Sequence, residues 1–229
     1  MSLIDLNILT NSLRSFSSGY RSRKYDQQFN EFWLWKNNSE LTSKPILDED
    51  NVTETWNRLR KILRVWQTYR STKNEYSYRD LKISLTDISE SYKELRPFTL
   101  LDFKKIPKCH LESIWHGLGR VKEPGGKENE EGEYFIIAVC KPLLLLWGQT
   151  LAFDTNVRFS LPKKLDVWMK EHRWTFTKWY NVMKSLSGCI NSHPEIIEFL
   201  ESESARRFGI NVQVPYGRFL DIYYFEKNK

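Results

Sequence analysis

The sequence predicts a mainly α-helical fold, a single-domain bundle of about seven to ten helices with little or no β-structure near the C-terminus. Apolar residues recur at intervals of three and four along several stretches, which is the spacing of one helix face. Aromatic residues make up 14% of the 229 residues, so the helices can bury a large apolar area. The chain is also long enough to form a sizeable hydrophobic core.

We divide the chain into an N-terminal extension, residues 1–50, and a helical core, residues 51–229. The extension mixes Ser, Thr and Asn with aromatic residues that fall at partly helical spacing between Phe29 and Trp35. This pattern predicts one short helix near residues 24–36, with loops on either side of it.

The helical core begins with the most regular pattern in the chain, between Asn51 and Arg70. An apolar stripe follows one helix face there and consists of Val52, Trp56, Leu59, Leu63 and Trp66. Asn51 followed by Glu54 has the spacing of a capping box. The same apolar spacing predicts a second helix over residues 79–96, which ends where Pro97 removes the next amide donor.

Shorter elements are expected in the middle of the chain. Thr99 can cap a short turn that ends at Pro107, and Leu111 to Leu118 marks a helix that ends at glycines. Residues 122–133 are polar, Gly-rich and acidic, which predicts a solvated loop.

A buried helix is expected next. Residues 134–147 are apolar almost throughout, which favours a helix that is either kinked at Pro142 or begins there. Asp154 can then cap a following helix over residues 155–161.

Three more helices are expected before the C-terminal segment. Apolar spacing predicts two of them around residues 165–172 and 176–186. Ser192 with Glu195 has the pattern of another capping box, and Pro194 suits the first turn of the helix that follows.

The C-terminal segment has a different pattern. Apolar and polar residues alternate from Ile210 to Val214, and Pro215 limits any strand there to a sheet edge. Arg218 and Asp221 are spaced to pair along one turn, and we expect the pair to close this segment onto the core.

Charge and cysteine content restrict the class of protein. Thirty-five Lys and Arg against 29 Asp and Glu give a net charge of +6, which fits a polyanionic partner without requiring one. The three widely spaced cysteines argue against a disulfide framework. Together with the lack of a secretory signal pattern, they predict a cytosolic protein, and the short apolar runs predict no membrane partner.

Basic side chains form one candidate surface for nucleic acid. Arg58, Arg60, Lys61 and Arg64 lie off the apolar stripe of the first core helix, and Lys163 and Lys164 begin a second basic stretch. Such a surface is either the solvated outer face that any amphipathic helix needs, or a set of phosphate contacts with Trp and Tyr side chains nearby for base stacking. The sequence leaves both interpretations open.

Asp154 is the sharpest single candidate for chemistry. A carboxylate at a helix start accepts backbone amide hydrogen bonds and meets the positive end of the helix dipole, so a structural role as a cap is sufficient. The same properties suit a carboxylate that activates a nucleophile or stabilises a developing cation beside an apolar pocket.

The segment around Asp154 resembles a known family. An apolar helix, Gly148 and then Phe153-Asp154-Thr155-Asn156-Val157-Arg158 are similar to the segment of helix-hairpin-helix DNA glycosylases written V-D-T-x-V-x-R or L-D-G-N-V-x-R. The resemblance implies a DNA partner, Asp154 as the catalytic aspartate and Arg158 as a residue that holds or orients a phosphate. It also implies that Trp147 and Phe153 form apolar walls around an extruded base.

The chain departs from that family upstream of the resemblance. Glu131-Gly132-Glu133-Tyr134 occupies the place of a glycine hairpin of the type L-P-G-V-G, and its two carboxylates would repel a phosphate. Lys141 is nearer to Asp154 than the family lysine, and no cysteine cluster for an iron–sulfur centre is present.

Two functions follow from these patterns. One is DNA binding on a glycosylase-like scaffold, with hydrolysis of a glycosidic bond if the protein is an enzyme. The alternative is a non-enzymatic helical protein–protein interaction module, in which Asp154 is a cap and the Trp side chains are core. No cofactor or metal site is predicted, since neither C-x-x-C nor H-E-x-x-H spacing occurs.

Overall fold

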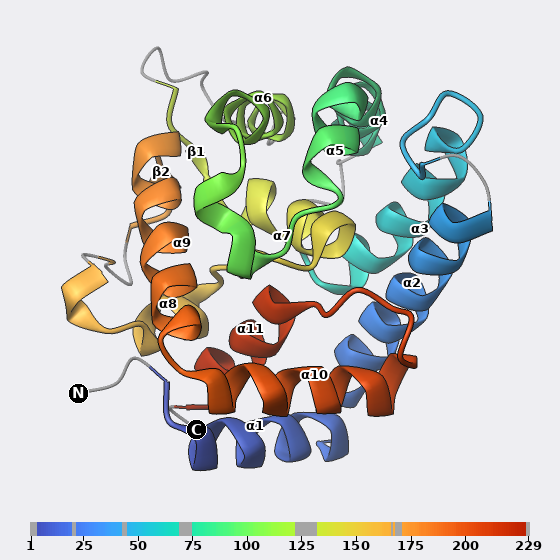
Figure 1. Cartoon of the computed structure of the whole chain (residues 1–229). Helices are drawn as coiled ribbons and strands as arrows, with labels where there is room; N and C mark the ends of the chain where they lie inside the picture. Colours follow the sequence, from blue (N-terminus) through green and yellow to red (C-terminus); the bar gives the residue numbers. More distant parts are fainter. Residues whose placement is uncertain are drawn as a thin grey trace.

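The protein is mainly helical (Figure 1), as its sequence predicts. The computed structural model describes residues 4–19, 22–42, 45–68, 75–121, 132–165, 167 and 171–227. Within these ranges it has eleven α-helices, more than the seven to ten predicted, two 3₁₀ helices and one two-stranded sheet.

The elements follow one another along the chain in this order: α1 (Leu6–Ser18), α2 (Ser22–Thr42), α3 (Val52–Val65), α4 (Glu75–Asp87), α5 (Ser89–Leu95), η1 (Leu100–Lys105), α6 (Lys108–Gly119), β1 (Tyr134–Phe135), α7 (Ile136–Trp147), α8 (Thr155–Ser160), η2 (Lys163–Leu165), β2 (Arg173–Trp174), α9 (Phe176–Asn191), α10 (Pro194–Phe208) and α11 (Tyr216–Glu226). The two strands pair antiparallel, with Tyr134 opposite Trp174. The alternating segment before Pro215 forms no strand and joins α10 to α11.

The helix predicted near residues 24–36 is confirmed as part of α2, but the prediction of a single short helix in residues 1–50 was wrong, because α2 is longer and α1 forms there as well. The Asp5 side chain caps α1 by accepting a hydrogen bond from the Ile8 amide at 3.0 Å. Leu9 and Leu13 from α1, and Trp33 from α2, are buried in the same hydrophobic cluster as the later helices. These residues are therefore part of the core and do not form an extension beside it.

The apolar stripes predicted for the following helices are largely buried. The predicted helix over 79–96 is divided into α4 and α5 at Ile88, although its apolar residues still share one buried face. The Thr99 cap is confirmed, since Thr99 and Asp102 form a capping box at the start of η1.

Both predicted capping boxes were wrong. The side chain of Asn51 donates to the Pro45 carbonyl and makes no cap bond to α3. His193 occupies the cap position of α10, and the Ser192 hydroxyl donates to the Cys189 carbonyl instead. Pro194 does occupy the first turn, as predicted.

Two predicted segments fall wholly or partly outside the described residues. These are the polar loop 122–133, of which only Gly132 and Glu133 are described, and the helix expected around 165–172, whose Trp168 and Met169 are not described.

Helix α7 is the most deeply buried element, and ten of its twelve residues are buried. Pro142 lies inside this helix without ending it. The helix packs against α2, α3 and α6 and ends at Gly148, whose φ of +72° favours glycine. A Cβ atom at Gly148 would also overlap the Trp33 ring, so glycine is required there for two reasons.

After α7 the chain runs through the core as an irregular link, residues 148–153, and α11 holds this link in place. The Arg218 amide donates to the Gly148 carbonyl at 3.1 Å, and the Asp221 carboxylate accepts from the Ala152 amide at 2.8 Å. Gly217 lets α11 come this close, because a Cβ atom there would overlap the backbone of Gln149. Hydrogen bonds with α11 therefore fix the link near both of its ends.

We expect Gly217→Ala to lower the free energy of unfolding by about 1–3 kcal/mol, because the added methyl group must push α11 away from the link. Gly188→Ala is the matched control. Gly188 lies inside α9 with open space around it, so alanine should raise the free energy of unfolding by about 0.5–1 kcal/mol. Urea unfolding of both variants measures the difference, and a Gly217→Ala protein as stable as the wild type would contradict the close approach.

Candidate functional site

A cavity of about 580 Å³ lies beside Asp154. This volume is within the range of pockets that hold small organic ligands. Its lining comes from segments far apart in the chain: Phe16, Tyr25, Trp66, Gln67, Thr68, Phe135, Ile137, Lys141, Ala152, Asp154, Thr155, Asn156, His172, Arg218, Asp221 and Phe225. Aromatic rings and four charged side chains therefore share one cavity, which is partly open to solvent.

The cap predicted at Asp154 is confirmed. Its Oδ1 accepts a hydrogen bond from the Val157 amide at 3.1 Å at the start of α8. Among the described residues no hydrogen-bond donor reaches Oδ2 of this carboxylate, which borders the cavity. The hydrogen bond from the Val157 amide to Oδ1 fixes the position of the carboxylate, and Oδ2 accepts no hydrogen bond from the described residues.

Arg158 lies behind Asp154 and not on the surface. Its side chain is 1% exposed, and its Nη1 donates to the Phe153 carbonyl at 3.0 Å. Its Nη2 donates to Nδ1 of His172, a residue that lines the cavity. Burial lowers the pKa of Arg158, while Asp154 and Glu171 raise it. The predicted phosphate contact by Arg158 was therefore wrong, because this guanidinium orders the backbone before Asp154.

Trp147 and Phe153 are not walls of the cavity, contrary to the resemblance. Both are fully buried: the Trp147 indole donates to the Phe98 carbonyl, and Phe153 packs on Trp174 with ring centroids 4.9 Å apart.

Other aromatic residues form the walls of the cavity. Tyr25 and Trp66 meet edge to face at a centroid distance of 6.3 Å, and Phe16, Phe135 and Phe225 complete the wall. Sequence spacing could not identify this set, since its members come from four helices or their ends and one strand.

The backbone beside the cavity holds an uncommon conformation at two places. Among the described residues, Gln67 and Phe153 are the non-glycine residues with positive φ, each at +51°. Gln67 lines the cavity, and Phe153 directly precedes Asp154. Such conformations cost free energy and gather at functional sites.

Gln67 ends α3 in a Schellman motif. The Thr68 amide donates to the Leu63 carbonyl, and the Gln67 amide donates to the Arg64 carbonyl. Glycine is the usual residue at the left-handed position of this motif, yet an exposed glutamine occupies it here.

The charges in the cavity are balanced. Asp154 and Asp221 contribute carboxylates, and Lys141 and Arg218 contribute cations. The Lys141 ammonium donates to the Trp66 carbonyl at 2.7 Å, so it also helps hold the end of α3. Arg218 donates to Asp221 at 3.1 Å, which confirms the pair expected from the sequence. Burial raises the pKa of Asp221, whereas Arg218 lowers it.

The predicted basic surface on α3 is partly occupied by internal contacts. Arg58 pairs with Glu54 at 2.8 Å and lies over the Trp35 ring, while Arg60 lies over the ring of Trp56. Lys61 and Arg64 are exposed, and Arg64 also lies over the ring of Tyr78. The helix that carries them leads directly into Trp66 and Gln67 at the cavity.

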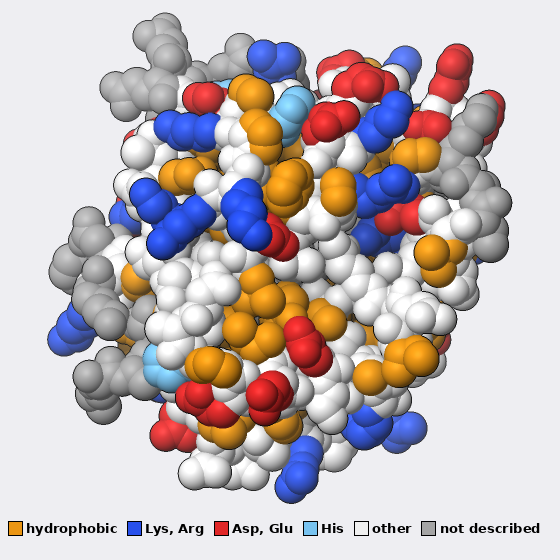
Figure 2. Space-filling model, viewed as in Figure 1, with side chains coloured by type: hydrophobic (Ala, Val, Ile, Leu, Met, Phe, Trp, Pro, Cys, Tyr) orange, Lys and Arg blue, Asp and Glu red, His pale blue; other side chains and the backbone are white. Residues whose placement is uncertain are grey.

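The second basic stretch is described only in part. Lys163 is exposed in η2, and the side chain of Lys164 lies outside the described residues. Figure 2 shows a face on which Lys and Arg side chains gather over α9 and η1, whereas Asp and Glu side chains lie over α10. The positive charge on this face is therefore concentrated over α9 and η1.

No protein-family model, curated protein or solved structure matches this chain. Within the described ranges, no cluster of three or more His, Cys, Asp and Glu side chains could hold a metal ion. Nor does any described helix combine the length and apolar character needed to cross a membrane.

We expect Gln67→Gly to raise the free energy of unfolding by about 1 kcal/mol, because glycine adopts the left-handed conformation without strain. Gln67→Ala is the control. It removes the same side chain but keeps the strained φ, so its stability should stay within about 0.5 kcal/mol of the wild type. Thermal or urea unfolding checks both variants, and a destabilised Gln67→Gly protein would show that the conformation carries no strain.

Proposed function

We propose that the protein binds DNA and cleaves an N-glycosidic bond, with the target base taken into the cavity beside Asp154. The observation that carries this proposal is a carboxylate held in place by a helix cap at the edge of a cavity with aromatic walls. A base removed from the stack needs a flat apolar pocket, and Tyr25 and Trp66 offer ring surfaces for it.

The chemistry requires a negative charge close to the sugar. When the bond between C1′ and the base nitrogen breaks, its electron pair leaves with the base and C1′ becomes positively charged. The Asp154 carboxylate can stabilise that cation or accept a proton from the attacking water. Water then adds to C1′ as hydroxide. The proton that the water loses neutralises the negative charge on the departing base.

DNA binding is supported by the position of the exposed cations. Lys61 and Arg64 lie on α3, whose C-terminal end borders the cavity, so phosphates contacted by this helix would lie near an extruded base. The net charge of +6 favours the encounter.

The chemical step is tested with Asp154→Asn. Asparagine caps helices as well as aspartate does, so we expect the variant to fold and to bind DNA. Base release from duplexes that each carry one modified base should fall by about 10²- to 10³-fold, because the negative charge is gone. Base release is measured by strand cleavage at the abasic product after alkali treatment.

Asp5→Asn is the matched control, since Asp5 caps α1 in the same way and does not line the cavity. It should release base at the wild-type rate. If the Asp154→Asn variant released base at the wild-type rate, Asp154 would be a helix cap and not a catalytic residue.

The binding step is tested with the double substitution Lys61→Gln and Arg64→Gln. We expect the slope of log affinity against log salt concentration to fall by about 2, because each phosphate contact contributes about 0.9. Arg206→Gln on α10 is the control. Arg206 is an exposed cation that pairs with Glu203, and it lies far from α3 in sequence. A wild-type protein that binds no duplex at about 50 mM salt would exclude the DNA function and favour a protein interaction module.

A further inference from the structure

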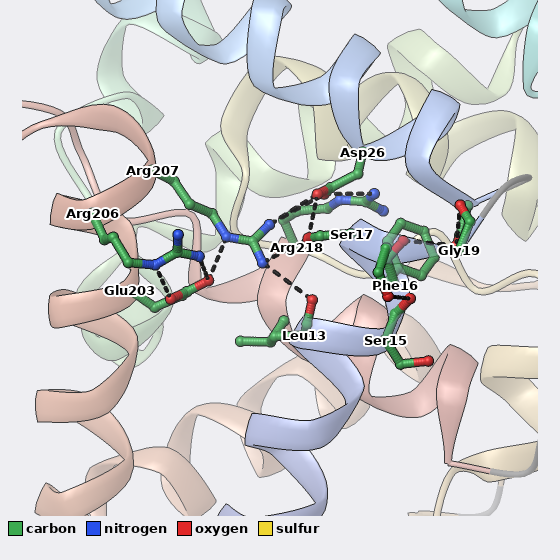
Figure 3. A network of polar contacts seen from close by, with 12 residues as sticks. Leu13, Ser15, Phe16, Ser17, Gly19, Asp26, Glu203, Arg206, Arg207 and Arg218 are labelled. Carbon is green, nitrogen blue, oxygen red and sulfur yellow. Dashed lines mark hydrogen bonds and ion pairs between the residues drawn. The ribbon is translucent and has the colours of Figure 1, made fainter.

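Arg218 is a buried cation at the cavity that has unused hydrogen-bonding capacity. Its side chain is 5% exposed, and it lies in the polar network that joins α1, α2, α10 and α11 (Figure 3). Nη1 donates to Asp221, and Nη2 lies 3.7 Å from Asp26, which is beyond hydrogen-bond length. Among the described residues, neither Nε nor Nη2 has a hydrogen-bond partner.

Three aromatic rings restrict the guanidinium. Its central carbon lies 5.1 Å from the ring centroids of Phe16 and Phe29 and 5.5 Å from that of Trp66. These rings pack around the guanidinium and limit rotation of the side chain. A buried donor without a partner costs about 1–3 kcal/mol, so a ligand that satisfies it would bind with that advantage.

Two neighbouring residues repeat this property. The Trp66 indole nitrogen and the Thr68 hydroxyl oxygen are buried without hydrogen-bond partners in the described structure, and both residues line the cavity. An indole nitrogen can only donate. The Thr68 hydroxyl can donate as well, so a ligand rich in acceptors would satisfy these groups together with Arg218.

The geometry of arginine narrows the choice of ligand. Nε and Nη2 form one edge of the planar guanidinium, which matches two adjacent acceptor atoms. Guanine presents such a pair in O6 and N7, whereas adenine presents N7 beside an amino group that donates. The adenine amino group would face an arginine donor.

The surrounding charges favour a neutral ligand over an anion. Asp26 and Asp221 already lie against Arg218, and Asp154 also borders the cavity. A phosphate or carboxylate placed at Arg218 would meet these carboxylates.

We infer that Arg218 selects a 6-oxopurine, by donating from Nε and Nη2 to O6 and N7 of a base held in the cavity. This inference rests on the proposed function, because it assumes that the cavity receives a base. It adds the substrate class, which the Asp154 chemistry leaves open.

The first test uses the wild-type protein and four nucleosides, with affinities measured by calorimetric titration. We expect 2′-deoxyguanosine and 2′-deoxyinosine to bind about 5- to 150-fold more tightly than 2′-deoxyadenosine. We also expect 7-deaza-2′-deoxyguanosine, which lacks the N7 acceptor, to bind more weakly than 2′-deoxyguanosine. Equal affinities across the four, no detectable binding, or displacement by inorganic phosphate would overturn the inference.

The second test compares Arg218→Lys with Arg207→Lys. Lysine keeps the charge but loses the planar fork, so the preference for 2′-deoxyguanosine over 2′-deoxyadenosine should fall below about 3-fold. Arg207 belongs to the same network through Asp26 and Glu203 but does not line the cavity, so its variant should keep the preference. A preference retained in a folded Arg218→Lys protein would reject Arg218 as the selecting residue. The nucleoside series decides the question if that variant does not fold.

The two proposals fail in different ways. Release of several bases from DNA by Asp154 without a purine preference would retain the proposed function and reject the role of Arg218. Selective binding of 6-oxopurine nucleosides without base release from any duplex would retain the ligand and reject the glycosidic chemistry.

Discussion

The structure depends on the buried link 148–153, which is held between α7 and α11. Gly148 turns the chain out of α7, and Asp221 binds the link at the Ala152 amide. Because the link is buried, each of its backbone groups needs a partner, and α11 comes close enough to supply two of these partners, the Arg218 amide and the Asp221 carboxylate. Asp154 follows directly, so the position of its carboxylate is set by core packing and not by a surface loop.

The fold could be predicted from local patterns to a useful extent. Apolar spacing identified most of the helices, and Asp154 and Thr99 were recognisable as caps. Helix α1 was missed and α2 was predicted too short, because their apolar stripes are interrupted by Ser, Asn and Gln, and their burial depends on α11 and α7. Asn51 does not cap α3, because its side chain donates to the Pro45 carbonyl instead. The spacing of residues in the sequence cannot show which of these two hydrogen bonds forms.

The site was less predictable than the fold. The resemblance around Asp154 placed one residue at the cavity, but Arg158 proved to be buried behind it. Trp66 was expected only as part of an apolar stripe, and Arg218 only as a packing residue. Their common cavity arises from contacts between segments far apart in the chain, which periodicity cannot detect. Tertiary geometry alone places the Arg218–Asp221 ion pair at the cavity.

The contact between α1 and α11 has a consequence for how the protein is made. The Asp5 amide donates to the Tyr223 hydroxyl across a separation of 218 residues, and the cavity takes Phe16 from one helix and Arg218 from the other. Nearly all of the described chain must leave the ribosome before α1 finds its partner. Until then the apolar face of α1 has no cover from α11. The nascent chain must therefore keep its first helix from aggregating until the helix that completes the cavity is synthesised.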